Sequence, residues 1–192
     1  MWPEKWDLFV EPDGLLLEPD PFSRARRIVP AQLITQVCIG WWPSSVRLSS
    51  GEYLFVPQRL MRQLADLAQA HQVPFVHRAD LWSWILEPFL DTEFSLEARA
   101  RTLELLEQNR VEEAELEAIR ARVGERMMTM TTVSWEWNHY GLFDVLCAMR
   151  AQGESRFAAF KAEAFAIADR GLVTSGTKDE FLAFAPPEDA QG

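Results

Sequence analysis

The chain has 192 residues, of which 48% are hydrophobic and 25% are charged, a composition typical of folded globular proteins. This composition excludes disordered, collagen-like and disulfide-scaffold proteins. The net charge of −10 argues against nucleic acid as the main partner, because nucleic-acid-binding proteins neutralise phosphates with Lys and Arg.

Residues 1–78 are predicted to form a small antiparallel β-sheet with one covering helix. Short apolar runs at residues 6–10 and 15–18 are joined by Glu-Pro-Asp-Gly, a sequence that favours a tight turn and therefore a hairpin. Residues 33–42 alternate and are rich in β-branched side chains, which is typical of a strand. A Ser-Ser-Gly-Glu turn separates two further strands, predicted at 46–48 and 53–56.

The pattern changes after Pro57. Apolar residues recur every three or four positions, which predicts a helix over residues 58–71 that covers one face of the sheet. Residues 73–76 are short and fit an edge strand.

Residues 79–184 are predicted to form an all-helical bundle of four to five helices, followed by a loose tail at 185–192. Asp80 and Ser95 are expected to cap the first two helices, and Asn109 to close the second in the left-handed conformation. The clearest periodicity is an apolar stripe at Leu116, Ile119, Val123, Met127 and Met130. Gly124 and the Thr-rich stretch 128–133 predict a kink or break there, before a helix at 134–151. A last helix is predicted at 155–170. The fold class is therefore α+β.

The N-terminus, the two cysteines and the uncharged segment 28–46 indicate a cytoplasmic protein without a membrane span. The N-terminus has no signal-peptide pattern, and Cys38 and Cys147 are far apart in apolar runs, which is typical of reduced cysteines in the cytoplasm. Residues 28–46 carry too many polar residues and prolines to span a bilayer.

Two segments, 82–93 and 135–144, embed carboxylates among tryptophans and other aromatic residues. Since a buried carboxylate must be neutral, paired or metal-bound, three interpretations are open. In the first, Glu87 or Glu136 forms an ion pair with Arg120 or Arg126. In the second, the carboxylates lie on the surface.

In the third interpretation, Glu136 and His139 form a Glu-x-x-His metal site. Residues three apart share a helix face, so both side chains reach one cation, and Glu87 and Asp91 supply ligands from the opposite helix. Iron, manganese or zinc is the expected metal in that case, whereas the other two interpretations need no cofactor.

Two surface features suggest binding rather than catalysis. Trp41 and Trp42 are adjacent on a predicted strand and point to opposite faces, so one indole stays exposed and is suited to anchor a partner. Arg24, Arg26 and Arg27 form a local basic cluster, which is either a solvated turn or a site for anions or lipid headgroups.

Parts of the sequence resemble other proteins. Residues 80–150, through Glu87 to Glu93 and the Trp-Glu-Trp at 135–137, resemble a pattern in bacterial proteins for which we know no activity. The first 76 residues, strands followed by a helix, look like a pleckstrin-homology-type module.

The familiar catalytic signatures are absent from the sequence, including phosphate-binding glycine loops, paired zinc cysteines and nucleophile elbows. We therefore expect a non-catalytic protein-interaction or regulatory module that binds a protein partner or self-associates. The alternative is a metal-binding helical bundle.

Overall fold

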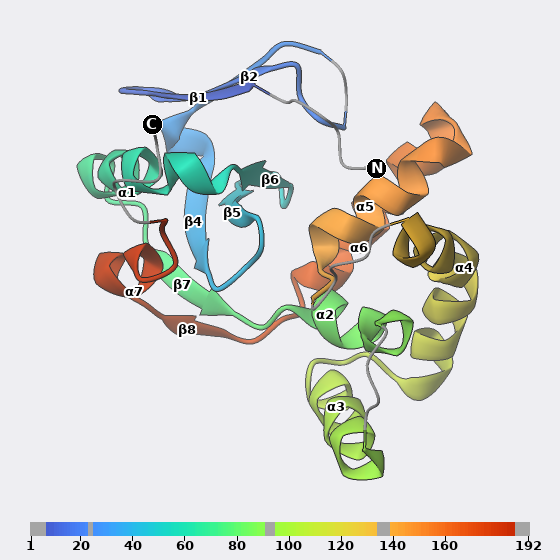
Figure 1. Ribbon diagram of the computed structural model, residues 1–192. Coiled ribbons are helices and arrows are strands. Elements are labelled where there is room, and N and C mark those ends of the chain that lie inside the picture. Colours follow the sequence, from blue (N-terminus) through green and yellow to red (C-terminus); the bar gives the residue numbers. More distant parts are fainter. Residues whose placement is uncertain (1–6, 23–24, 91–94, 134–138, 187–192) are drawn as a thin grey trace. The chain divides into compact units, whose positions relative to one another are not determined.

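The computed structural model describes residues 7–22, 25–90, 95–133 and 139–186. It is an α+β fold, as the sequence predicts. The chain divides into two compact units (Figure 1). The sheet unit combines residues 7–78 with 173–186, and the helical unit spans Ala79–Leu172.

The sheet unit begins with a three-stranded antiparallel sheet of β1 (Asp7–Glu11), β2 (Gly14–Glu18) and β3 (Arg27–Pro30), with β2 in the centre. The hairpin predicted at the Glu-Pro-Asp-Gly turn is confirmed by the β1–β2 register. The sequence does not predict β3, because Ile28 and Val29 are its only aliphatic residues and lie between an arginine cluster and a proline.

The second sheet has the strand order β6-β5-β4-β7-β8. Its strands are β4 (Ile34–Ile39), β5 (Ser44–Leu48), β6 (Tyr53–Val56), β7 (Phe75–Arg78) and β8 (Val173–Ser175). β4 and β7 run parallel. Two parallel strands cannot be joined by a tight turn, so the chain must cross over between β4 and β7. The helix α1 (Met61–Ala70) lies in this connecting segment, directly before β7. The single antiparallel sheet of the prediction is thus two sheets, and one of them is mixed.

The end of the chain returns to the sheet unit. β8 pairs with the outer edge of β7, so the prediction that residues 73–76 form an edge strand is wrong. The helix α7 (Lys178–Leu182) follows β8. Residues 173–184, which the sequence analysis assigned to the helical bundle, therefore lie with the sheets, because pairing with a strand so distant in the chain leaves no local pattern.

One hydrophobic core holds the sheet unit together. The inward side chains of both sheets, α1 and α7 meet in it, as Leu8 and Leu17 of the first sheet, Val37 of the second, Leu64 of α1 and Phe181 of α7 show. The helix predicted at 58–71 is thereby confirmed as the cover of this core. All five side chains are at most 2% exposed.

The helical unit consists of α2 (Leu81–Leu86), α3 (Leu96–Gln108), α4 (Glu113–Val133), α5 (Leu142–Met149) and α6 (Glu154–Ala168). The predicted caps are confirmed: Asp80 accepts a hydrogen bond from the Ser83 amide at 3.3 Å, and Ser95 accepts one from the Ala98 amide at 3.1 Å. The left-handed residue after α3 is Arg110, with φ 63°, and not Asn109. The Asn109 side chain instead accepts a hydrogen bond from the Leu172 amide at 2.8 Å.

The longest helix, α4, buries the predicted apolar stripe, whose five side chains are at most 7% exposed. The stretch 128–133 does not break the helix, because α4 continues to Val133, whereas the alternative of a kink stays a prediction. Residues 134–138 lie outside the described residues, and the next helix begins only at Leu142. Gly124 fits the packing inside α4, since a Cβ there would lie 3.3 Å from the Phe89 ring.

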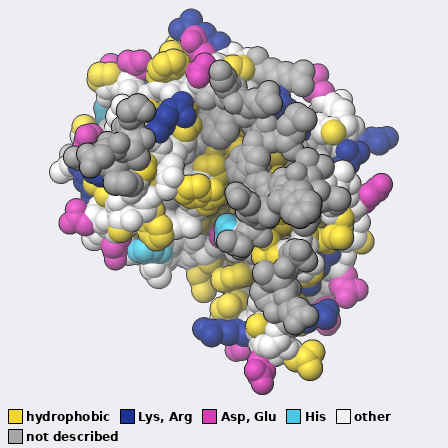
Figure 2. Space-filling model, viewed as in Figure 1, with side chains coloured by type: hydrophobic (Ala, Val, Ile, Leu, Met, Phe, Trp, Pro, Cys, Tyr) yellow, Lys and Arg dark blue, Asp and Glu magenta, His cyan; other side chains and the backbone are white. Residues whose placement is uncertain are grey.

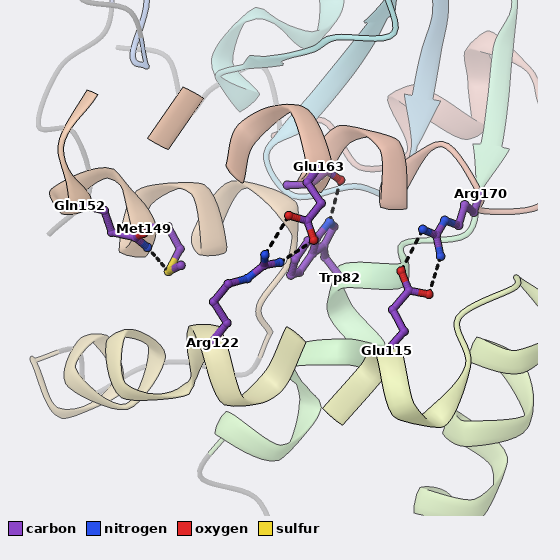
Figure 3. A network of polar contacts seen from close by, with 8 residues as sticks. Trp82, Glu115, Arg122, Met149, Gln152, Glu163 and Arg170 are labelled. Carbon is purple, nitrogen blue, oxygen red and sulfur yellow. Dashed lines mark hydrogen bonds and ion pairs between the residues drawn. The ribbon is translucent and has the colours of Figure 1, made fainter. Parts of the chain in front are cut away.

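Polar contacts connect α4 to α6 and to the end of the unit (Figure 3). Both guanidinium nitrogens of Arg122 donate to the Glu163 carboxylate at 2.7 and 2.8 Å, and those of Arg170 donate to Glu115 at 2.8 and 2.9 Å. Such two-point pairs fix orientation, although at exposed positions each stabilises by only about 1 kcal/mol or less. Among the described residues, no helix has the length and apolarity needed to cross a membrane.

Candidate functional site

The three-stranded sheet is apolar on both faces. Leu8, Leu15, Leu17 and Val29 point into the core. Side chains alternate along a strand, so Phe9, Leu16 and Ile28 point outward. The register places Leu16 opposite both Phe9 and Ile28, which aligns these three side chains across the strands. We call this set the apolar row.

The apolar row is accessible. Ile28 is 68% exposed, Phe9 is 46% exposed, and Leu16 is half-buried between them. In the space-filling view, hydrophobic, acidic and basic side chains lie next to each other along the upper edge, where Figure 1 draws β1 and β2 (Figure 2). Single exposed hydrophobic residues are ordinary, but an aligned set on a sheet face is typical of a binding surface.

A polar row flanks the apolar row on one side. Asp7 lies opposite Glu18 in the register, and Arg26 pairs with Glu18 at 2.6 Å. The outward acids therefore outnumber the one base in this row. On the other side, the next outward positions are Glu11, Gly14 and Pro30.

A groove of about 290 Å³ lies beside the apolar row, with Gly14 in its lining. Leu16, Ile28 and Pro30 line it with apolar atoms, and Glu11 and Asp13 line it with exposed carboxylates. Gly14 has φ 155°, and a Cβ at this position would collide with the Val29 carbonyl oxygen. Only glycine therefore fits at this position, where β2 and β3 approach each other closely.

Sequence reasoning missed this surface, although one signal was present. Three consecutive leucines at 15–17 cannot all face one side of a strand, so they indicate a strand that is apolar on both faces. The position of Ile28 on this surface could not be predicted, because β3 itself was not predicted.

The two tryptophans proposed as partner anchors differ in their surroundings. Trp41 is 5% exposed, stacks on Tyr53 with ring centroids 5.0 Å apart, and donates from its indole nitrogen to the Arg78 carbonyl at 2.9 Å. It is therefore a core residue. Trp42 is 48% exposed and remains a candidate anchor.

The arginine cluster contacts acids of its own unit. Arg27 lies 2.6 Å from Glu52 and 3.7 Å from Asp20, and the hydrogen bond with Glu52 raises the pKa of Arg27. Arg26 pairs with Glu18. Arg24 lies outside the described residues. These contacts favour a structural role over the anion or lipid site considered from the sequence.

The predicted ion pair between Glu87 and Arg120 stays a prediction, and Arg120 also contacts the backbone of α2. Arg120 donates to the backbone carbonyls of Ile85 at 2.9 Å and Trp84 at 3.2 Å. Burial lowers the pKa of Arg120, and Glu87 acts on it through electrostatic attraction. Arg126 is exposed on α4. Glu136 and Asp91 lie outside the described residues, so their predicted pairs and ligand roles stay predictions.

His139 meets a different acid from those predicted. Its Nε2 lies 3.9 Å from Asp80 Oδ2, and partial burial lowers the pKa of His139. Burial raises the pKa of Asp80 to about 7. The residues that the structure describes contain no group of three or more His, Cys, Asp or Glu side chains arranged for a metal ion. The iron, manganese or zinc alternative stays a prediction.

Asp144 is the second acid near Asp80. It is 1% exposed, and its Oδ2 accepts the Gly141 amide hydrogen at 2.8 Å, which caps α5. Its Oδ1 is buried and has no hydrogen-bond partner among the described residues. Burial and the neighbouring Asp80 raise the pKa of Asp144 to about 7. Chemically, these two carboxyls can take up and release protons near neutral pH.

Cys147 follows Asp144 by one helical turn. Burial and the nearby Asp144 raise the pKa of its thiol to about 12, so the thiol is protonated and a poor nucleophile. Neither Cys38 nor Cys147 forms a disulfide.

Comparisons with known proteins do not extend this description: no family model, no curated protein and no solved structure matches the chain. The resemblances of residues 80–150 and of the first 76 residues therefore stay predictions.

Proposed function

We propose that this protein is a non-catalytic interaction module of the cytoplasm that binds a protein partner on the outer face of its three-stranded sheet. The single observation that supports this function is the apolar row, Phe9, Leu16 and Ile28, aligned across three strands with its middle residue half-buried and its ends exposed. A sheet face of this kind offers a partner apolar area whose burial stabilises a complex by about 25 cal/mol per Å² before association costs.

The groove at Gly14 adds shape to the apolar area. Binding sites combine an apolar centre with a polar rim, and here the acids at positions 7, 11, 13 and 18 surround the apolar centre. We place Trp42 outside this site, because it lies between β4 and β5 of the other sheet.

Replacing Ile28 by aspartate is expected to weaken partner binding at least tenfold, because a charge at the centre of an interface costs about 1.4 kcal/mol or more. A library of random decapeptides is selected on the wild-type protein, and the affinities of the selected peptides for wild type and Ile28→Asp are compared by calorimetry. Folding is preserved in the variant, since Ile28 is 68% exposed. Near-ultraviolet circular dichroism checks this.

The matched control is Leu96→Asp, which makes the same kind of change at a side chain that is 86% exposed on α3 of the helical unit. Selected peptides should bind this variant as they bind the wild type. Equal affinity for wild type and Ile28→Asp would overturn the proposed function.

A further inference from the structure

The size of the groove at Gly14 limits what it holds. Its volume of about 290 Å³ is at the lower limit of small-molecule sites, which span about 300–1,000 Å³. The groove is also open to solvent on the sheet surface and not enclosed as cofactor sites are. Its dimensions fit a side chain of a partner better than a whole cofactor.

The charge of the groove points to a cationic partner. Glu11 and Asp13 contribute exposed carboxylates, and its lining contains no Lys, Arg or His. Of the nearby basic residues, Arg26 pairs with Glu18, and Arg27 pairs with Glu52 and Asp20. His71 Nε2 lies 2.8 Å from the Pro12 carbonyl oxygen. With a net charge of −10, a second copy of this chain is repelled, whereas a basic segment is attracted.

We propose that the groove at Gly14 binds one apolar side chain of an extended segment of a partner protein, and that a Lys or Arg two residues from this side chain pairs with Glu11 and Asp13. This inference rests on the proposed function and specifies its partner. In an extended segment, side chains two residues apart lie on the same face, so the apolar side chain and the cation both face the sheet. The segment then continues over the apolar row.

Two synthetic peptides test the inference. The first, Ser-Lys-Ser-Leu-Ser-Leu-Ser-Lys-Ser, carries the apolar and basic residues on one face, and the second replaces both lysines by glutamate. Binding is measured by chemical-shift titration of the full-length protein. We expect the lysine peptide to bind at least fivefold more tightly than the glutamate peptide, with the largest shifts at Gly14, Leu16 and Ile28.

The double variant Glu11→Gln with Asp13→Asn removes both charges and keeps the apolar walls. This variant should bind the lysine peptide at least fivefold more weakly than the wild type does. It should bind the glutamate peptide at least as tightly as the wild type does. The control is Glu97→Gln with Glu107→Gln, which removes the same charge from exposed positions on α3. This control should bind the lysine peptide as the wild type does.

The outcomes separate the inference from the proposed function. If both peptides bind equally and both lose affinity in Ile28→Asp, the partner does not need a basic residue, so the inference is wrong. The proposed function of the sheet face is then still supported. If the lysine peptide binds the uncharged variant Ile28→Ser as tightly as the wild type, the proposed surface itself is wrong. If the two double variants lose affinity for the lysine peptide equally, the peptide is attracted by the overall negative charge of the protein and not by the groove. That result would overturn the inference.

Discussion

Replacing Trp82 by alanine is expected to lower the free energy of unfolding of the helical unit by about 3–5 kcal/mol. Trp82 on α2 is 0% exposed. Its indole nitrogen donates to the Ala164 carbonyl on α6 at 3.0 Å (Figure 3), and its ring meets the edge of Phe160 with centroids 6.0 Å apart. Alanine leaves a cavity between these helices and removes the hydrogen bond to the Ala164 carbonyl, and each adds to the cost.

Hydrogen exchange of the α2 and α6 amides in urea measures this loss within the helical unit. The control is Trp42→Ala, which truncates the same side chain where it is 48% exposed, and which should change the stability of the sheet unit by about 1 kcal/mol or less. Similar small effects of the two variants would contradict the packing of Trp82 described here.

The sequence predicted those elements whose signals are local. The apolar stripe of α4 recurs at helical spacing over several turns, and Asp80 and Ser95 stand directly before apolar helical segments. The first hairpin followed from its turn residues. In each case the residues that determine the structure lie within one continuous segment of the chain.

The elements that the sequence did not predict depend on distant partners. β8 is three residues long and exposed throughout, so no alternation marks it, and its partner β7 lies far earlier in the chain. β3 is similarly short. The apolar row needs the register of three strands, and without β3 only its β1 and β2 members were within reach of sequence reasoning.

The pair Asp80 and Asp144 illustrates the same limit. Asp80 was expected only as a helix cap, and Asp144 only as one acid of an aromatic segment. Their interaction arises because α2 and α5 begin close together, where a Cβ on Gly141 would lie 2.8 Å from Asp80 Oδ2. The small residue permits this approach, which the sequence does not reveal.

Replacing Asp144 by asparagine is expected to raise the stability of the helical unit above pH 7 by about 2–4 kcal/mol, and to leave it unchanged near pH 4. Asparagine keeps an oxygen to accept the Gly141 amide hydrogen, so the cap of α5 is preserved. It also removes a charge that burial and Asp80 oppose. The gain in stability above pH 7 and the absence of a change near pH 4 both follow from the raised pKa of Asp144, about 7 in place of 3.8.

The direction in which the stability changes with pH follows from the number of protons bound to the folded and the unfolded chain. Below about pH 4 residue 144 is protonated in the folded and unfolded chain, so its titration contributes nothing. Between about pH 4 and 7 the folded protein keeps a proton that the unfolded chain has lost, and the wild type therefore becomes less stable as pH rises. Above the raised pKa of about 7 both states are ionised, and the loss is complete. The variant lacks this loss.

Urea unfolding of wild type and Asp144→Asn at a series of pH values, followed by hydrogen exchange of α5, measures the difference. Glu125→Gln is the control, because it neutralises an exposed carboxylate on α4 of the same unit, and its difference from the wild type should not grow with pH. A constant difference for Asp144→Asn across the range would mean that the Asp144 carboxyl is ionised throughout. In that case burial and the neighbouring Asp80 would not oppose the charge of Asp144, and the raised pKa of this carboxyl would be wrong.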